Sequence, residues 1–539
     1  MYLEKFYGRK SILELLRRRV FDLKDGYRQN IAFLGERHTG KSLILQKFLS
    51  DLDDNAIISV YLDLENRDFQ YMFYKMVGSI LYHYCKARKL PPHDNITLLI
   101  QTTRKELPLT VKEVRKIEQL MSAGKRQDAY KGLISLPQTF AQETGMFCVL
   151  IFDEFQRLED LGMKDTFQEL GKTIMTQRRC LYIVTSSLPS VASKILSERL
   201  SLLFGDFEII QIDPFDHKTS QEFIRFHLHE IKINDLLESF LIDFTGGQPL
   251  SLCLICEELF NLCVVHNQKE IFHPLFSQGV ENVLFNRWGV LSRHYEIILQ
   301  QISAGKGNLV MPLILQTLSE GKKRLKDVAI GTDLRQTPAK QKISKLMELG
   351  IIEKNGGYYY IKDKLFKYWM RYVYKKRKEI IEVDPQRQKK AFRENLGEAI
   401  DRFQAVSQKG FSYRIIDLLG QFEEDSFQIN GRRYKLMPFR NIRPMKIQNS
   451  SGASFEVLKA SAANGTWYIV LTPDGVREAD IHEFLEEIRK EDKPQKCILI
   501  SFSHLDENAR IKALQERMWI WNEQELNTLL NIYDQPFIV

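Results

Sequence analysis

The chain has 539 residues, of which 44% are hydrophobic and 27% charged, and its net charge is +8. This length excludes a single hydrophobic core, so we expect several domains. No apolar run reaches the roughly 18 residues that a membrane helix needs, and the opening residues MYLEKFYGRK lack the apolar core of a signal peptide. The net charge is mild for this length, so any nucleic-acid contact must come from local patches.

The seven cysteines are few, odd in number and scattered along the chain. This usage is typical of a protein in a reducing compartment, and we expect a cytoplasmic location. Cys253 and Cys256 form a CxxC pair, but no second pair follows at metal-site spacing. We therefore interpret both as packing residues.

A phosphate-binding motif stands at residues 35–42, where GERHTGKS matches G-x-x-x-x-G-K-[ST] in full. An apolar strand, NIAFLG, precedes it and an amphipathic helix, SLILQKFLSDL, follows. Backbone N–H groups and the helix N-terminus bind phosphates in such a loop, with Lys41 on the β- and γ-phosphates and Ser42 on Mg²⁺. A glycine-rich turn that matches by chance is the alternative. The predicted nucleotide-binding residues here are Gly35, Glu36, Arg37, His38, Thr39, Gly40, Lys41 and Ser42.

A second motif ends the apolar segment 146–158, MFCVLIFDEFQRL, with two adjacent carboxylates. We expect Asp153 to complete the Mg²⁺ shell and Glu154 to polarise the attacking water as general base. The second carboxylate favours hydrolysis over transfer to a substrate. Another strand, at 56–65, and a helical insert, at 70–143, separate the two motifs.

A third strand, CLYIVTSSLPS at 180–190, ends in Thr185, Ser186 and Ser187. A polar side chain at such a strand tip can sense the γ-phosphate, and Ser187 is our candidate. The alternative is a plain hydroxyl turn.

These motifs, with FYGRKSILELL at 6–16 and FTGGQPLSL at 244–252, resemble the archaeal-type ATPase family. That family belongs to the signal-transduction ATPases with numerous domains (STAND), relatives of the AAA+ origin-recognition initiators. The resemblance covers about residues 1–265. It implies ATP and Mg²⁺ as cofactors, and a helical lid that packs on the nucleotide from the glycine–proline box. It adds four nucleotide-binding residues: Phe6, Gly8, Arg9 and Pro249.

The family also implies a homo-oligomer in which one subunit's arginine completes the neighbour's site. Its usual Gly-Arg after the sensor strand is missing, because this chain has Asp206 at that position. Arg199 can stand in as the arginine finger, or it can be a surface or ion-pair arginine.

Residues 309–362 read as three helices followed by two strands around Asn355-Gly356-Gly357, a hairpin turn signal. This pattern predicts a winged helix-turn-helix. Its third helix carries side chains able to meet DNA phosphates and base edges: Lys340, Gln341, Lys342 and Lys345. Winged helices also serve as protein-docking or rigid coupling modules, so a protein partner is the alternative to DNA.

Two further basic segments follow the predicted wing, at 375–390 and between Arg432 and Lys446. The first reads as a charged linker helix with a solvated face, with phosphate contact as the alternative. For the second, the sequence does not show whether the cations share a face.

The tail resembles the restriction-endonuclease-like, PD-(D/E)xK domain that often follows the winged helix in this family. Such nucleases bind Mg²⁺ through an acid on one strand and an E-x-K on the next. Glu456 is our candidate for the first acid, but the second strand offers Val470-Leu471-Thr472. We expect an inactive nuclease fold used for binding or assembly, unless Asp474 or Glu398 supplies the missing acid.

Together these features predict an α/β, P-loop NTPase core of the ASCE, AAA+-like type at 1–215. A helical lid at 216–285, a winged helix at 286–380 and a nuclease-like domain at 381–539 follow. We expect an ATP-hydrolysing switch that couples nucleotide state to DNA binding and assembly, away from membranes. The alternatives are a signalling or defence scaffold that binds protein partners, and an ATP-dependent nuclease.

Overall fold

The structure, a computed structural model, describes residues 6–65, 68–200, 205–305, 307–379, 384–429, 432–448, 454–472, 476–491, 493–502 and 505–537. The chain divides into two compact units. The first is Met1–Phe215 with Gln248–Leu250, and the second is Asp216–Gly247 with Ser251–Val539. Within the described residues, no helix has the length and apolar character needed to cross a membrane.

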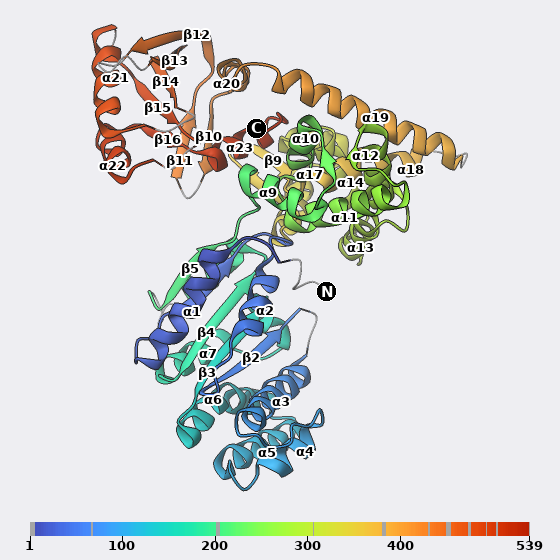
Figure 1. The fold of residues 1–539 in the computed structure, drawn as a ribbon, viewed down its shortest axis with the longest axis vertical. Helices are drawn as coiled ribbons and strands as arrows, with labels where there is room; N and C mark the ends of the chain where they lie inside the picture. The colour runs from blue at the N-terminus through green and yellow to red at the C-terminus, as the bar shows by residue number, and fades with distance from the viewer. Residues whose placement is uncertain are drawn as a thin grey trace. The chain divides into compact units, whose positions relative to one another are not determined.

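The first unit is built on a five-stranded parallel sheet (Figure 1). Its strand order is β2-β3-β4-β1-β5. The inner strands β1, β3 and β4 are almost wholly buried, as is typical of parallel sheets covered on both faces. Because every strand runs the same way, their carboxyl ends meet at one edge. The strands are β1 (Asn30–Leu34), β2 (Ile57–Asp63), β3 (Phe147–Asp153), β4 (Cys180–Ser186) and β5 (Phe207–Gln211).

Helices cover both faces of this sheet, because alternate side chains of each strand point to opposite sides. On one face, α1 (Lys10–Lys24) and α2 (Lys41–Asp51) pack on Ile31 and Phe33 of β1. On the other, α3 (Phe69–Ala87), α6 (Arg126–Thr144) and α7 (Thr166–Thr176) pack on Ala32 and Leu34.

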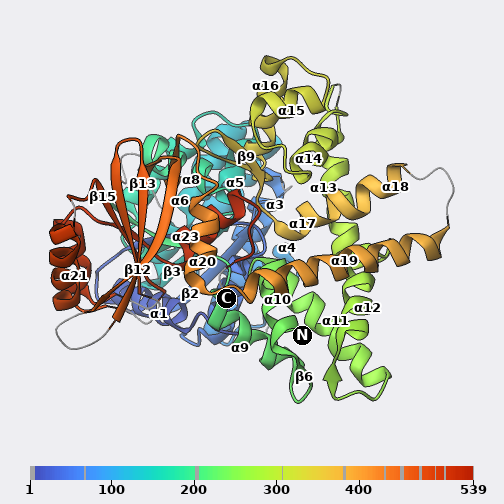
Figure 2. The same cartoon turned by 90° about the horizontal axis from the view of Figure 1, so that it is seen from above.

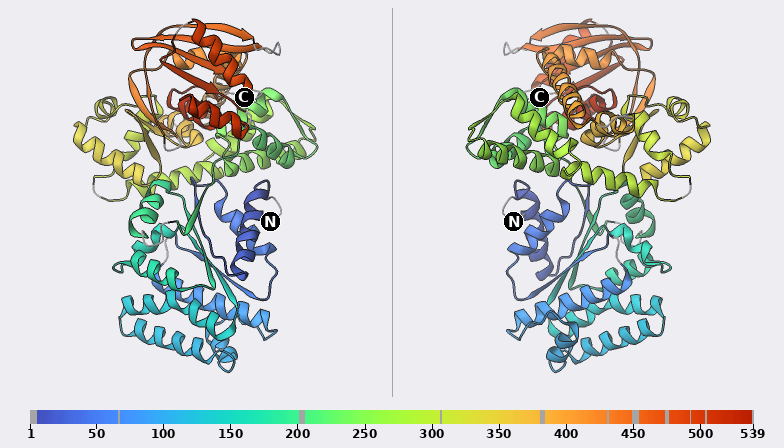
Figure 3. Two further views of the ribbon diagram at one scale, coloured as in Figure 1. Left: turned by 90° about the vertical axis from the view of Figure 1, so that its left-hand side faces the viewer. Right: turned by 90° about the vertical axis from the view of Figure 1, so that its right-hand side faces the viewer.

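The helical insert between β2 and β3 consists of α3, α4 (Ile96–Thr103), α5 (Pro108–Ser122) and α6 (Figure 3). Its buried side chains belong to the same hydrophobic core as one face of the sheet. Short helical turns follow β3 and β4: η2 (Phe155–Leu161), α8 (Pro189–Lys194) and η3 (Ile195–Arg199).

The second unit begins with a helical region. It contains α9 (His217–Leu228), α10 (Asp235–Thr245), α12 (His273–Val280), η5 (Glu281–Phe285), α13 (Val290–Ser303) and most of α11 (Pro249–Val265). Two short strands, β6 (Lys232–Ile233) and β7 (Glu270–Ile271), pair in parallel beside these helices.

Three helices and an antiparallel hairpin follow, in the order read from the sequence. They are α14 (Met311–Ser319), α15 (Leu325–Gly331), α16 (Gln336–Glu348), β8 (Ile352–Asn355) and β9 (Tyr358–Ile361). The next helices are α17 (Lys364–Trp369), η6 (Met370–Tyr374), α18 (Lys375–Glu379), α19 (Pro385–Ser407) and α20 (Phe411–Leu419). Of the basic run 375–390, residues 375–379 form α18 and residues 385–390 belong to α19.

The chain ends in a second five-stranded sheet, in the order β12-β13-β14-β15-β16 (Figure 2). β12 to β14 are antiparallel, β14 to β16 are parallel, and β12 forms one edge. A separate hairpin precedes this sheet: β10 (Asp425–Ile429) and β11 (Arg432–Leu436). The sheet strands are β12 (Phe439–Gln448), β13 (Ser454–Ala462), β14 (Gly465–Leu471), β15 (Lys496–Ile500) and β16 (Trp519–Trp521), and the helices are α21 (Glu478–Glu491), α22 (Glu507–Gln515) and α23 (Glu523–Ile532).

The β8–β9 hairpin packs against this C-terminal part of the same unit. The Asn355 side chain accepts from the Gln428 N–H at 2.7 Å and donates to the Gln428 carbonyl at 2.9 Å. The Tyr358 ring stacks on Phe427, with centroids 5.9 Å apart. Tyr358 and Tyr360 are members of the hydrophobic core beneath β13 and β14. The hairpin and the C-terminal sheet therefore share one core.

Candidate functional site

The loop after β1 has the backbone geometry of a phosphate-binding loop. Gly40 caps α2 with φ 91°, in the left-handed region that favours glycine. Gly35 allows a close approach, because a Cβ there would collide with the Ile212 carbonyl. The strand, the glycine-rich turn and the helix that begins at Lys41 are the structural context that the motif requires.

Lys41 lies folded back into this loop and is only 5% exposed. Its ammonium donates to the carbonyls of Gly35 at 2.9 Å and Glu36 at 2.6 Å. Burial lowers the pKa of Lys41, while the nearby carboxylates of Glu154 and Asp153 oppose that shift. The buried cation therefore lies close to both carboxylates of the second motif.

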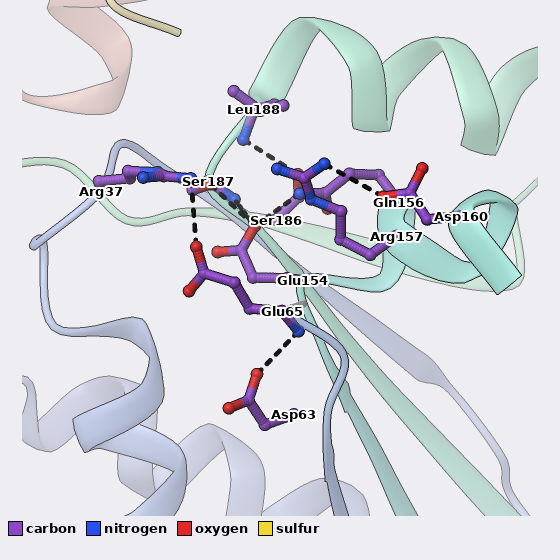
Figure 4. Close-up of polar contacts among 10 residues, drawn as sticks. All are labelled: Arg37, Asp63, Glu65, Glu154, Gln156, Arg157, Asp160, Ser186, Ser187 and Leu188. Carbon is purple, nitrogen blue, oxygen red and sulfur yellow. Dashed lines mark hydrogen bonds and ion pairs between the residues drawn. The ribbon is translucent and has the colours of Figure 1, made fainter. Parts of the chain in front are cut away.

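The other loop residues make local contacts. Thr39 donates to the Glu36 carbonyl at 3.0 Å, and His38 has a left-handed φ of 67°. Arg37 is exposed and forms an ion pair with Glu65 at 3.3 Å (Figure 4). The Glu36 carboxylate accepts from Gln248 at 3.2 Å, a residue of the segment assigned to the first unit.

The four nucleotide-binding residues that the family resemblance implies lie in two places. Arg9 caps α1 with a φ of 56°; its guanidinium donates to the Asp213 carbonyl and lies 5.0 Å from the Phe215 ring centroid. Phe6 packs against the core under α1, and Gly8 has a φ of 68°. Pro249 is the first residue of α11, next to Gln248.

Asp153 is buried at the end of β3 and accepts two hydroxyl hydrogen bonds, from Tyr61 and from Thr185. Tyr61 also shares a hydrogen bond with Ser42. Burial and the Asp153 charge raise the pKa of Tyr61, so its hydroxyl keeps its proton. One tyrosine thus links the two residues expected to hold Mg²⁺.

Glu154 has a φ of 55°, an uncommon conformation for a non-glycine residue. Its N–H donates to the Thr185 hydroxyl at 3.2 Å. Its carboxylate accepts from the Ser187 N–H at 3.2 Å and from the Ser187 hydroxyl at 2.8 Å. Gln156 donates to the same carboxylate oxygen (Figure 4). The carboxylate is therefore held at the tip of β4.

Sequence reasoning missed two residues of this network, Tyr61 and Gln156, and it missed the hydrogen bonds of Thr185 with Asp153 and Glu154. Tyr61 had a signal, since it stands near the carboxyl end of a strand that pairs directly with β3. A polar residue there faces the site edge. Arg199, at the end of η3, forms an ion pair with Glu159.

The donor set at this edge suits Mg²⁺. A serine hydroxyl and a buried carboxylate supply the oxygen ligands that this hard cation prefers. Ser42 and Asp153 are the residues that would hold it, and a bound Mg²⁺ would neutralise phosphate charge.

The predicted DNA-binding residues all lie on α16, in the second unit. Lys340, Gln341 and Lys345 are exposed. Lys342 is half-buried and donates to Asn308 at 3.1 Å. Three of the four side chains are thus available to a partner.

Glu456, on β13, pairs across the sheet with Lys446 of β12 and Leu471 of β14. Within the described residues, no group of three metal-capable side chains includes Glu456. Asp474 lies outside the described residues.

No protein-family model and no curated protein matches this sequence. Among solved structures, the chain is similar to the Walker-type ATPase PABY2304 of Pyrococcus abyssi, with 16% identity over 68% of this chain and 96% of that one, and a TM-score of 0.49. It is also similar to the Aeropyrum pernix ORC1 protein in complex with DNA, with 11% identity, coverage of 68% and 94%, and a TM-score of 0.39. The Thermotoga maritima RuvB Holliday junction branch migration motor matches with 13% identity, coverage of 68% and 95%, and a TM-score of 0.35.

These likenesses are too distant to carry a function over to this chain. The class of the first unit rests on its own features: a parallel α/β sheet, with the glycine–lysine–serine loop joining β1 to α2. These features define a P-loop unit.

Proposed function

We propose that the first unit binds ATP with Mg²⁺ and hydrolyses it. The observation that carries this proposal is the meeting of five side chains at one edge of the sheet. Lys41 and Ser42 come from the start of α2, Asp153 and Glu154 from the end of β3, and Ser187 from the end of β4. The Lys41 ammonium, the Asp153 carboxylate and the proposed base Glu154 thus lie where the γ-phosphate of a bound ATP would be.

Each residue has a role in this proposal. The main chain of 36–42 cradles the phosphates, and the Lys41 ammonium exchanges its two carbonyl partners for phosphate oxygens. Tyr61 orients the Asp153 carboxylate through its hydroxyl. Gln248, directly before α11, borders the loop through its hydrogen bond to Glu36, and Pro249 is the first residue of that helix.

Glu154 is the proposed general base, and its partner Ser187 is the proposed γ-phosphate sensor. In the described arrangement, Ser187 and Gln156 hold the base. A phosphate that recruits Ser187 would loosen this hold and leave Glu154 to accept a proton from water. Release of the base would then depend on the presence of the γ-phosphate.

Two variants test the core assignment. Lys41→Ala should abolish ATP binding in a calorimetric titration. Glu154→Gln should bind ATP within about threefold of wild type but lower kcat by about 10²- to 10⁴-fold, because the amide cannot accept the proton. Hydrolysis by Glu154→Gln at the wild-type rate would contradict the base assignment. Asp160→Asn, an exposed carboxylate of the helical turn η2 that pairs with Arg157, serves as the matched control.

A second proposed function is DNA binding through α16, supported by the exposed Lys340, Gln341 and Lys345. Here the helices α14–α16 and the β8–β9 hairpin act as a winged helix. Fluorescence anisotropy with a labelled duplex at low salt, with ATP present, should give binding that weakens steeply as salt rises. Lys340→Glu with Lys345→Glu should remove it, while Lys490→Glu on α21 should not. An unchanged affinity in the double variant would exclude α16 as the contact.

Coupling of the hairpin to the C-terminal sheet supports the competing proposal, a scaffold for protein partners. It is motivated by the Asn355–Gln428 bonds and the shared core. This proposal expects ATP-dependent homo-oligomers in analytical ultracentrifugation with no effect of DNA. If Arg199 acts as a finger in the neighbour's site, Arg199→Ala should lower hydrolysis in the oligomer and leave ATP binding intact.

A nuclease role has the least support, because Glu456 pairs with Lys446 and Leu471 rather than with a second acid. Incubation of plasmid with Mg²⁺ or Mn²⁺ tests it directly. We expect intact plasmid for wild type and for Glu456→Ala alike, and cleavage by wild type alone would revive the role.

A further inference from the structure

A group of three side chains in the second unit has the chemistry of a metal site and lies outside the residues proposed above to bind ATP or DNA. His227 lies near the end of α9, while Cys253 and Glu257 lie on α11. One ligand atom from each, an imidazole nitrogen, a sulfur and a carboxylate oxygen, lies within 4.8 Å of the other two. Within the described part of the chain, this is the one group of three or more metal-capable side chains so closely placed.

The two helices bring the group together through ordinary helix geometry. Cys253 and Glu257 are four residues apart, so they lie above one another on the same face of α11. The Cys253 thiol donates to the Glu257 carboxylate at 3.2 Å. His227 reaches the same place from α9 and is only 7% exposed.

The aromatic side chains around His227 fix its position. The Phe223 ring centroid lies 4.3 Å from that of His227, and the Phe226 centroid lies 5.4 Å away. Packing of this kind limits the rotamers open to the imidazole. Folding therefore already orders the His227 side chain, so that metal binding costs little additional side-chain entropy at this residue.

The donor set selects the metal. Sulfur and imidazole nitrogen are poor ligands for Mg²⁺ and Ca²⁺, which prefer oxygen. Zn²⁺ takes cysteine sulfur, histidine nitrogen and carboxylate oxygen, usually in tetrahedral sites. Three protein ligands and one water are the ordinary composition of an open zinc site.

The distances also suit Zn²⁺ after a small adjustment. Tetrahedral zinc, with bonds of about 2.0–2.3 Å, places its ligand atoms roughly 3.5 Å apart. The described separations, up to 4.8 Å, require a closure of about 1 Å. Rotation of the half-buried Cys253 and Glu257 side chains supplies it without moving either helix.

The CxxC spacing alone led us to interpret both cysteines as packing residues, and the site proposed here reassigns only Cys253. Cys256 is fully buried, and burial raises its pKa. A buried thiol of this kind is inert. The partners of Cys253 are instead one turn further along α11 and on another helix.

We propose that His227, Cys253 and Glu257 bind one Zn²⁺, with water in the fourth position. On binding, the Cys253 thiol gives its proton to solvent and its thiolate bonds the metal. The ion cross-links α9 to α11. This site is independent of the proposed ATP function.

Cobalt substitution tests the proposal on the full-length protein. After dialysis against a chelator, Co²⁺ should produce a thiolate-to-cobalt charge-transfer band with one equivalent bound, and Zn²⁺ should bleach it. Because the proposed Mg²⁺ residues Ser42 and Asp153 offer no sulfur, the band reports a cysteine site rather than Co²⁺ bound at the proposed ATP site. Absence of the band in the folded wild-type protein would overturn the proposal.

Variants assign the ligands. Cys253→Ser should remove the band and weaken Zn²⁺ affinity by about 100-fold or more, since loss of a ligand exceeds the effect of an outer-shell partner. Cys263→Ala, a cysteine of the same helix outside the group, should keep the band. A full band in Cys253→Ser would overturn the assignment.

Two further measurements keep the proposal testable if Cys253→Ser misfolds. Glu257→Gln changes a half-buried side chain and should weaken Zn²⁺ affinity while circular dichroism stays unchanged. Lys41→Ala should lose ATP binding and retain the cobalt band, which separates failure of this site from failure of the ATP site. Equal Zn²⁺ affinity in Glu257→Gln and wild type would exclude Glu257 as a ligand.

Discussion

Tyr61 joins the two halves of the proposed Mg²⁺ site with a single hydroxyl group. It donates to Asp153 and shares a hydrogen bond with Ser42, and burial keeps it protonated. A group in this position orients the carboxylate without being a ligand itself. Such outer partners commonly control metal affinity.

Removal of this hydroxyl should therefore act on the metal rather than on the nucleotide. We expect Tyr61→Phe to raise the Mg²⁺ concentration needed for half-maximal hydrolysis by about 10-fold, with little change in kcat at saturating Mg²⁺. Steady-state kinetics at varied Mg²⁺ measures this. Tyr74→Phe, at an exposed tyrosine of α3, is the control. An unchanged Mg²⁺ dependence would show that Tyr61 only packs.

Burial of Lys41 gives a pH dependence with a definite sign. Its pKa in the folded protein lies below the ordinary 10.5. The ammonium thus loses its proton at a lower pH than a free lysine does, and ATP affinity should fall as pH rises into that range. Isothermal titration calorimetry at increasing alkaline pH measures the ATP affinity. An affinity that stays constant up to pH 10.5 would contradict the prediction.

The lowered pKa of Lys41 also affects the stability of the nucleotide-free protein, which should increase as pH rises. A depressed lysine pKa means that the folded state binds the proton less tightly than the unfolded state. The charged form therefore costs stability at neutral pH, and this cost disappears as pH rises through the two pKa values. Lys41→Met should raise the melting temperature of the nucleotide-free protein at neutral pH and abolish its further rise with ATP. A lowered melting temperature would show that the Gly35 and Glu36 carbonyl bonds outweigh the burial cost.

At the scale of elements, those marked by a local sequence pattern could be predicted, whereas strands that lack such a pattern could not. The loop at 35–42 and the strand ending at Asp153 were readable because motif, strand and helix are neighbours in sequence. The β10–β11 hairpin was missed, since three of the five residues of β11 are exposed and basic. β5 was missed for a similar reason, because its edge position leaves it without the continuous burial of the inner strands.

Contacts between side chains that are far apart in the sequence could not be predicted from the sequence. His227 could not be matched to Cys253, because only the packing of α9 and α11 brings them together. Likewise, the contact of Asn355 with Gln428 depends on how the β8–β9 hairpin packs. Thr337 followed by Pro338 is the sequence pattern of an N-cap and a first helical residue. α16 begins at Gln336 instead, a difference within ordinary boundary error.

The Asn355 contact yields a prediction for the hairpin element. Asn355→Ala would leave the N–H and carbonyl of Gln428 without their amide partner. Loss of two partly buried hydrogen bonds should lower the free energy of unfolding by about 2 kcal/mol. Urea titration followed by tryptophan fluorescence measures it. Lys354→Ala, exposed on the same hairpin, should cost almost nothing, and an equal loss in both variants would refute the argument.

At the scale of the whole molecule, the shared core decides which parts can move separately. Tyr358 and Tyr360 belong to the core under the C-terminal sheet, so separating the hairpin from that sheet would expose both rings. Any rearrangement driven by ATP should move residues from α14 to the C-terminal sheet together. We therefore expect the proposed winged helix to move together with the C-terminal sheet and not independently of it.

Hydrogen exchange can check this coupling across the second unit. Tyr358→Ala should accelerate exchange in β9, β10 and the end of α23 together, because the Tyr358 ring contacts Phe427 of β10 and Tyr533 at the end of α23. Acceleration limited to the β8–β9 hairpin would show that the two parts open independently. Tyr413→Ala, an exposed aromatic on α20, is the control.

Because β12 is an edge strand, its cationic residues can have a role apart from nucleic-acid binding, which is to protect that edge from other β-strands. An edge strand offers unsatisfied backbone groups to any passing β-strand, which makes it a nucleus for fibrils. Arg440, Arg443, Pro444 and Lys446 all lie exposed along β12. Positive charge and a proline repel or block a foreign strand there. These residues would thereby protect the colloidal stability of the protein at high concentration, whether or not a nucleic acid ever meets them.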